Sequence, residues 1–397
     1  MQVQARDGRA EATAKWLVFA LLSALTFAIA YALMARPASD LSIHATWASE
    51  GDFLHPRSFV THHAHPLWHF TAKALMLTGL GFRLSGALAM LLWKLPELGA
   101  AYALARRLLG DDAKPYAPAL CTLCLMLVSA VCVPALNPTV YVGGGTPNTW
   151  HSPTQQAVLG FMLLCVPMVA SSYDRFAAQP GYREPWKSWL LLTALLALSV
   201  LAKPVYLQAF LPAACLFFLV QWIRHPSGSR YFLGMVAAVV PSVLMMALQT
   251  YFYFLNPSGN TGMAILLTWD KAKDCLIGLA LLEAFPLFAL LTEKRGAKGT
   301  LLTLTVLYNA VAFLEKLLLS EVGQRANDGN FGWGLLAASL MLWAVMLPRF
   351  VRQFREWRAA ATRTGTWRYW LGGSLLAYHL ASGVYYAAYL LTTTNAL

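Results

Sequence analysis

The chain has 397 residues, of which 58% are hydrophobic and 12% are charged. Soluble domains are about 25% charged on average, so a soluble enzyme, a disordered protein and a secreted disulfide scaffold are excluded. An all-α polytopic membrane protein remains. The net charge of +12 predicts basic cytoplasmic loops that meet membrane lipids, and not a nucleic-acid partner.

Eleven apolar runs follow one another along the chain and predict a single transmembrane domain over residues 1–397. They lie at residues 16–35, 84–108, 115–136, 154–172, 188–202, 204–223, 231–254, 275–291, 300–319, 331–349 and 369–391. The first run follows basic residues, as in a signal peptide. Its length of about 20 residues favours an uncleaved first helix.

Residues 66–82 decide the topology, because they are apolar but barely long enough to span, and they contain His69 and Lys73. If they form an interfacial helix, most Lys and Arg residues fall in cytoplasmic loops, as the positive-inside rule requires. The N-terminus is then cytoplasmic. The loops at 36–83, 137–153 and 320–330, which are rich in polar residues, all become extracytoplasmic.

The first of these loops begins with Asp40, and His44 follows four residues later. On a helix, residues four apart share a face. A carboxylate there can act as a general base or hold a divalent cation, and a histidine can orient it or donate a proton. We therefore predict Asp40 and His44 as catalytic residues. The alternative is that Asp40 only caps a helix.

His65, His69 and Lys73 recur every four residues and predict one polar stripe on the interfacial helix, opposite Leu67 and Phe70. The stripe could bind an anionic substrate, or it could simply be solvated. A zinc site is a further alternative, although the spacing His-His-x-His-x3-His over residues 62–69 is not a standard ligand pattern. The sequence leaves the metal unknown, and magnesium or manganese at Asp40 stays open.

The second outer loop leads into a predicted helix start, with Ser152 as N-cap, Pro153 at the first helical position and Gln155 completing a capping box. The free N–H groups of such a helix end favour an anion. The residues just before it, Asn148, Trp150 and His151, are predicted to bind substrate. A tryptophan beside polar groups suits stacking on a sugar, or it belongs to the interfacial aromatic belt.

Four further residues are predicted to contact substrate. Lys203 interrupts two apolar runs and either binds a phosphate or snorkels to the interface. In the late outer loop, Arg325 can grip a phosphate with its planar guanidinium, near Glu321 and Asp328. The alternative for Arg325 is a purely structural ion pair with Glu321.

The order of these features resembles the GT-C class of integral-membrane glycosyltransferases. The resemblance covers Asp40 to Gly110, chiefly the stretches SDLSIH, HPLWHF and YALARRLLG. It implies a bacterial inner-membrane enzyme that inverts the anomeric carbon and acts on the extracytoplasmic side. The implied donor is a sugar on polyprenyl phosphate or diphosphate, and the implied acceptor is a glycan or glycolipid of the cell surface. A polysaccharide polymerase and a single-sugar transferase are both compatible with it.

Two other classes of function stay open. A transporter or flippase of an anionic lipid-linked sugar would place polar residues near the membrane midplane and contain inverted repeats, whereas the polar clusters here fall at one face. A membrane acyltransferase would need a histidine within the membrane. His379 in the last apolar run is the candidate, and a core histidine with satisfied hydrogen bonds is the alternative.

Overall fold

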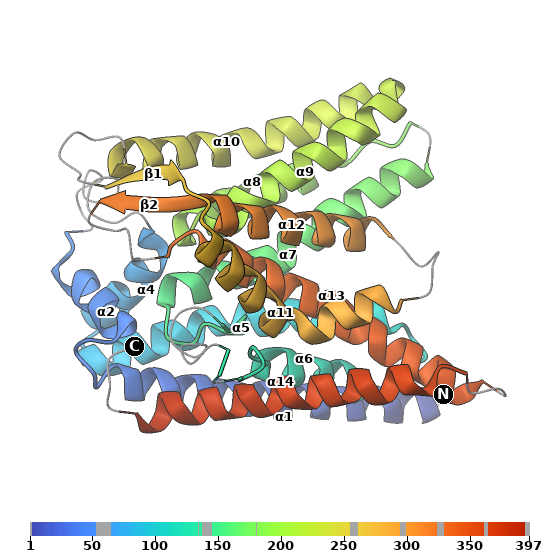
Figure 1. The fold of residues 1–397 in the computed structure, drawn as a ribbon, viewed down its shortest axis with the longest axis horizontal. Coiled ribbons are helices and arrows are strands. Elements are labelled where there is room, and N and C mark those ends of the chain that lie inside the picture. The colour runs from blue at the N-terminus through green and yellow to red at the C-terminus, as the bar shows by residue number, and fades with distance from the viewer. Residues whose placement is uncertain are drawn as a thin grey trace.

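The computed structural model describes residues 2–52, 65–133, 135–136, 145–179, 181–254, 261–293, 299–323, 329–360 and 364–393. The first half of the chain forms α1 (Gln2–Leu33), α2 (Asp40–Glu50), α4 (Pro66–Leu77), α5 (Phe82–Leu109), α6 (Ala117–Leu127), α7 (Pro153–Ala178) and α8 (Trp186–Ala202). The second half forms α9 (Val205–Arg224), the 3-10 turn η1 (Pro226–Gly228), α10 (Ser229–Phe254), β1 (Thr261–Ile265), α11 (Trp269–Leu291), α12 (Thr300–Leu318), β2 (Leu319–Gly323), α13 (Gly332–Ala359) and α14 (Thr366–Thr392). Most of the helices run along the long axis of Figure 1.

Eight of the described helices are long and apolar enough to cross a membrane, namely α1, α5, α7, α9, α10, α11, α12 and α13. The predicted class of all-α membrane protein is therefore confirmed. The predicted number of eleven spans is not. Helix α8 has 17 residues and α6 has only 11, which is about 17 Å for α6 against a hydrocarbon core of about 30 Å. Helix α14 has 27 residues but is not among the eight.

Helix α6 ends early because the residues after it bond to other parts of the chain. The Ala130 N–H donates to the Gly145 carbonyl, and the Val131 N–H donates to the Leu281 carbonyl, each over 2.8 Å. Backbone groups in an apolar interior must be satisfied. Contacts with distant segments do this here in place of helical bonds. The prediction that 115–136 is one helix is therefore wrong, since only its first half is helical.

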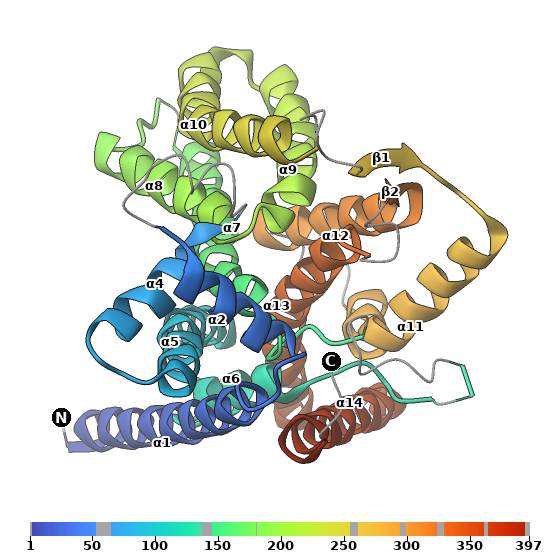
Figure 2. The same ribbon diagram turned by 90° about the vertical axis from the view of Figure 1, so that its left-hand side faces the viewer.

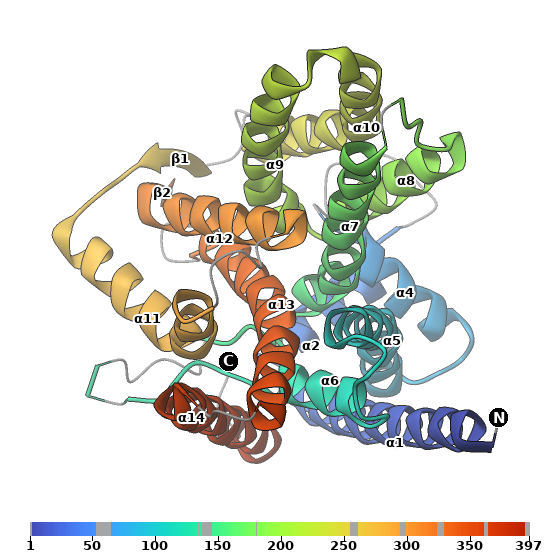
Figure 3. The ribbon, with the colours of Figure 1, turned by 90° about the vertical axis from the view of Figure 1, so that its right-hand side faces the viewer.

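Helix α13 lies at the centre of the molecule (Figure 3), packed against α5, α7, α9, α11 and α12. Its apolar stretch is buried on all sides, as expected for a helix without a polar face. Trp343 in its middle stacks on Phe285 of α11, with ring centroids 4.9 Å apart, and its Nε1–H donates to the Leu282 carbonyl. This packing fixes α13 and, with it, the residues at its N-terminal end.

Helices α2 and α4 and the antiparallel pair β1–β2 lie at one end of the long axis, here called the α2 end (Figure 1). The N-terminus and the turn between α9 and α10 lie at the opposite end. Viewed from the α2 end, α2 and α4 lie in front of the end of α5 (Figure 2). Helix α4 has 12 residues and is not one of the candidate spans. Its exposed side carries Phe70 and Leu77, whereas His69 is buried together with Trp68 and Ala72. The predicted extent of 66–82 is wrong, since the helix ends at Leu77.

Lys94 and Glu97 form an ion pair within α5. The Lys94 ammonium lies 3.1 Å from both carboxylate oxygens of Glu97, and both side chains are fully buried in α5. The amide of Gln156 on α7 also donates to Glu97. Such a pair is tolerated in an apolar interior because each charge has a partner.

Candidate functional site

Asp40 is the first residue of α2, and its side chain points to the following turn. The cap of this helix is Ser39, whose Oγ accepts the Ser42 N–H over 3.2 Å. Asp40 Oδ1 lies 3.3 Å from Nε2 of His44. The structure therefore forms the predicted pair of Asp40 and His44, and the alternative in which Asp40 serves only as the helix cap does not hold.

Behind this pair, two further groups continue a chain of contacts. His44 Nδ1 lies 2.8 Å from Nε2 of His69 on α4. His69 Nδ1 lies 2.9 Å from the carbonyl oxygen of His65 and must donate to it, because a carbonyl only accepts. His69 therefore contacts His44 instead of lining an anion pocket with its ring nitrogens. His65 takes part through its main chain.

Asp40, His44 and His69 form a continuous chain of contacts that ends on the His65 carbonyl. An imidazole ring can donate through one nitrogen and accept through the other, so a chain of this kind can relay a proton.

Aromatic rings and burial hold the cluster in place. Trp47 and Trp68 contact the His44 ring, with centroids 4.8 and 6.5 Å away. His69 is 2% exposed, whereas a third of the Asp40 side chain, 33%, remains accessible. The carboxylate is therefore the part of the cluster that a substrate can reach.

The charge around Asp40 keeps its carboxylate ionised. Burial raises its pKa, but the hydrogen bond from His44 and the positive charges of His44, His151 and Lys203 outweigh this effect and bring the pKa down to about 2. The stability that the ionised group contributes is complete above its usual pKa of 3.8 and is lost as the pH falls toward 2. At neutral pH Asp40 is thus an anion near the Lys203 ammonium, which follows α8.

Lys203 and His151 are held by residues that the sequence did not single out. Lys203 joins α8 to α9, and its ammonium lies 4.1 Å from the ring centre of Trp333 at the start of α13. His151 Nδ1 lies 2.7 Å from the hydroxyl of Tyr386 on α14. Burial lowers the pKa of His151, against the opposing effect of Asp40. A cation–π contact of this kind is worth about 0.5 to 2 kcal/mol, which keeps the ammonium at the site.

The segment before α7 has a more structural role than predicted. The side-chain amide of Asn148 donates to the carbonyls of Leu125 and Val128, over 2.8 and 2.9 Å, and so holds the C-terminal end of α6. Trp150 is 2% exposed, and the Lys94 ammonium lies 5.9 Å from its ring centre. Its Nε1–H finds no acceptor among the described residues. Neither side chain presents an open surface to a sugar.

Helix α7 begins at Pro153, as predicted, but the predicted capping box is wrong. The Ser152 side chain makes no capping bond. The Gln155 amide instead donates to the Trp333 carbonyl over 3.2 Å. Gln155 is fully buried, and its bond joins the start of α7 to the start of α13. Tertiary packing has redirected a side chain whose local spacing favoured a cap.

The remaining predicted residues lie apart from the cluster. The Lys73 ammonium donates to the carbonyl of Ser49 over 2.5 Å and joins α4 to the last turn of α2. Both carboxylate oxygens of Glu321, on β2, accept from the Asn330 amide over 2.8 Å.

Arg325 and Asp328 lie outside the described residues, as do His62 and His63 of the zinc alternative. The predicted phosphate contact of Arg325 and its alternative ion pair with Glu321 both stay predictions.

Within the described ranges, no three or more His, Cys, Asp and Glu side chains are arranged to hold a metal ion. Magnesium and manganese prefer oxygen ligands, and the cluster contributes a single carboxylate whose neighbours are already hydrogen-bonded to each other. These residues do not fit a divalent cation, and we derive no chemical step from one.

His379, the candidate of the acyltransferase alternative, is a fully buried residue of α14. Its Nδ1–H donates to the Ser129 carbonyl over 2.6 Å, and its Nε2 accepts the Phe285 N–H over 3.3 Å. Both ring nitrogens are therefore occupied. The residue supports the packing of α14 against the extended segment after α6, as the core alternative predicts.

The fold and the site define a class: an α-helical membrane-embedded protein with a partly buried carboxylate–imidazole cluster at one end of its helices. Comparison of the chain with protein-family models, curated proteins and solved structures finds no match in any of the three.

Replacement of His69 by Phe tests the contact chain behind Asp40. The ring keeps its place between the tryptophans but loses both nitrogens, so the His44 Nδ1–H loses its acceptor. We expect the activity of the protein to fall about tenfold, the loss of one hydrogen bond of about 1.4 kcal/mol, with KM unchanged and an altered pH profile. His65→Ala keeps the carbonyl and should change activity less than threefold (about 0.6 kcal/mol). Equal losses in both variants would contradict this assignment.

Proposed function

We propose that the protein is an integral-membrane glycosyltransferase of the GT-C type. It would move a sugar or oligosaccharide from a polyprenyl phosphate or diphosphate to an extracytoplasmic glycan or glycolipid. The observation that carries this proposal is the partly accessible Asp40 carboxylate, supported by His44 and His69 and lying close enough to Lys203 and His151 for their charges to lower its pKa.

In the proposed reaction, the hydroxyl oxygen of the acceptor attacks the anomeric carbon of the donor sugar. The bond from that carbon to the phosphate oxygen breaks, and the electron pair leaves with the phosphate. Asp40 takes the acceptor's proton as general base. His44 holds the carboxylate in position, and His69 in turn holds His44.

Positively charged groups would stabilise the departing phosphate. Negative charge grows on the phosphate as the bond breaks, and a cation already positioned there stabilises it most where water is excluded. Lys203 is 7% exposed and is held on the Trp333 ring, so its ammonium is in place before the donor binds. We assign the phosphate contact to Lys203, with His151 as a neighbouring donor.

The predicted topology places the α2 end outside the cytoplasmic membrane, where lipid-linked sugars are used for cell-surface polysaccharide and glycolipid assembly. The basic residues at the opposite end support this orientation through the positive-inside rule. Both a single-sugar transferase and a polymerase fit the same cluster, because the chemistry at the anomeric carbon is the same.

The test uses the purified full chain in liposomes with radiolabelled hexoses on polyprenyl phosphate, offered one at a time with cell-envelope glycolipid as acceptor. We expect transfer of label from donor to acceptor with inverted anomeric configuration. Movement of intact labelled donor across the bilayer, without transfer, would overturn the proposal in favour of the transport alternative. That alternative finds little support in α5, where Lys94 and Glu97 neutralise each other and offer no free charge to a passing substrate.

A further inference from the structure

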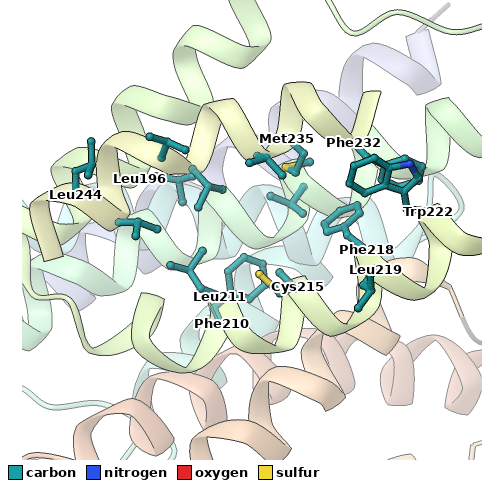
Figure 4. A pocket seen from close by; sticks show the side chains of 16 residues that line it. Leu196, Phe210, Leu211, Cys215, Phe218, Leu219, Trp222, Phe232, Met235 and Leu244 are labelled. Atoms are coloured by element: carbon teal, nitrogen blue, oxygen red, sulfur yellow. The ribbon is translucent and has the colours of Figure 1, made fainter. Parts of the chain in front are cut away.

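A cavity lies between α5, α7 and α8, and none of its lining residues belongs to the Asp40 cluster. Its volume is about 380 Å³, within the range of small-ligand sites. The three helices are neighbours in Figure 3, which views the molecule from the end opposite to α2. Unlike the larger cavity between α7, α8, α9 and α10 (Figure 4), which is lined only by apolar residues, this cavity has a polar rim.

The lining divides along the helix axis. Arg107, Ser171 and Arg175 lie in the last turns of α5 and α7, and Ser188 lies in the first turn of α8. The apolar lining residues include Ala100, Ala103, Leu104, Leu163 and Leu164. At 1.5 Å per residue, Ala100 lies about 10 Å deeper than Arg107 along α5. The cavity therefore has a cationic mouth at one end of an apolar channel.

Of the two arginines at the mouth, Arg175 has a carboxylate partner within the described part of the chain and Arg107 has none. Arg175 is paired with Glu184 over 2.8 Å. Burial raises the pKa of Glu184, but hydrogen bonds from Ser172, Arg175 and Ser188 outweigh this effect, so the pKa is lowered. Glu184 is thus an anion already engaged by its own neighbours. Arg107 donates to the Ser171 hydroxyl over 2.5 Å and has no carboxylate partner among the described residues.

From this arrangement we propose that the cavity is a binding site for an anionic phospholipid. Its phosphodiester would accept from the Arg107 guanidinium, which is held at the mouth by the Ser171 hydroxyl while that hydroxyl donates to the Pro167 carbonyl. One acyl chain would lie along Ala103 and Leu164. A guanidinium matches phosphate oxygens in shape and charge, and basic pockets between membrane helices bind anionic head groups. The amphipathic division of the cavity is the reason to commit to a lipid over a free anion.

The test compares adjacent arginines on α5. Arg106 carries the same charge but is ion-paired with Glu11 of α1 over 2.9 Å, so Arg106→Gln is the matched control for Arg107→Gln. Phosphatidylglycerol retained by the detergent-purified full chain is measured by native mass spectrometry. Phosphatidylcholine and glycerol phosphate serve as comparison probes. We expect Arg107→Gln to lower the apparent affinity for phosphatidylglycerol at least tenfold and Arg106→Gln less than threefold.

A second variant tests the apolar channel independently of the arginine charge at the mouth. Ala103 is exposed on α5, so Ala103→Trp can fill the channel without disturbing the core. We expect it to lose phosphatidylglycerol although both arginines remain. Equal losses in the two arginine variants, equal binding of phosphatidylcholine, or full binding by Ala103→Trp would each overturn the proposal. If Arg107→Gln does not fold, Ala103→Trp decides the outcome.

Discussion

The rate of the proposed sugar transfer is expected to fall by about 10²- to 10⁴-fold when Asp40 is replaced by Asn, the range that a positioned general base contributes. Asparagine has nearly the same shape and can still accept a hydrogen bond from His44 at the 3.3 Å contact. It cannot take the acceptor's proton. The loss should therefore appear in kcat, with the binding of the lipid-linked donor largely retained.

Asp174→Asn is the control for this variant. Asp174 is an exposed carboxylate on the last turns of α7, so its replacement removes the same charge far from the cluster. We expect its transfer rate to match that of the unchanged protein. Full activity of the Asp40 variant, measured with the same labelled donor, would remove Asp40 from the catalytic role.

Replacement of Gly383 by Ala is expected to lower the free energy of unfolding by about 3 kcal/mol or more, the upper end of the range for forcing an atom into a packed core. A Cβ atom at this position would lie 1.5 Å from the Leu127 carbonyl oxygen and 3.2 Å from the Ser129 nitrogen. The obstacle is backbone, which cannot rotate away as a side chain can. Either α14 or the extended segment after α6 must move.

Gly373→Ala, on the same helix, provides the matched comparison. No atom lies within 4 Å of a Cβ at that position, and alanine is the better helix former by about 1 kcal/mol. We expect its stability to equal or exceed that of the unchanged protein. Both can be measured as thermal unfolding in detergent, followed by tryptophan fluorescence. If the Gly383 and Gly373 variants unfold at the same temperature, the close contact of α14 with this segment is wrong.

Features that depend on neighbouring residues could be predicted from the sequence. The apolar runs predict membrane helices because about 20 apolar residues are needed to cross the hydrocarbon core. The pairing of Asp40 with His44 follows from helix periodicity, which brings residues four apart onto one face. The start of α7 at Pro153 follows from the fixed backbone angle of proline. In each case local geometry decides the outcome.

Contacts between distant segments could not be predicted in the same way. His44 meets His69 across 25 residues, and His151 meets Tyr386 across 235. No local pattern encodes either distance. The apolar run at 115–136 shows the same limit, since Ala130 and Val131 leave the helix to bond with segments that only the folded chain brings near.

The sequence by itself therefore determined the class of the protein, the end of the molecule at which its polar groups gather, and the Asp40–His44 pair. The tertiary structure alone decided that His69 supports His44, that Lys203 rests on Trp333, and that Asn148 and Gln155 hold helices together. The physical reason is that burial makes an unpaired polar group costly. Each such side chain takes whichever partner the packing brings within reach, and that partner is set by the arrangement of whole helices.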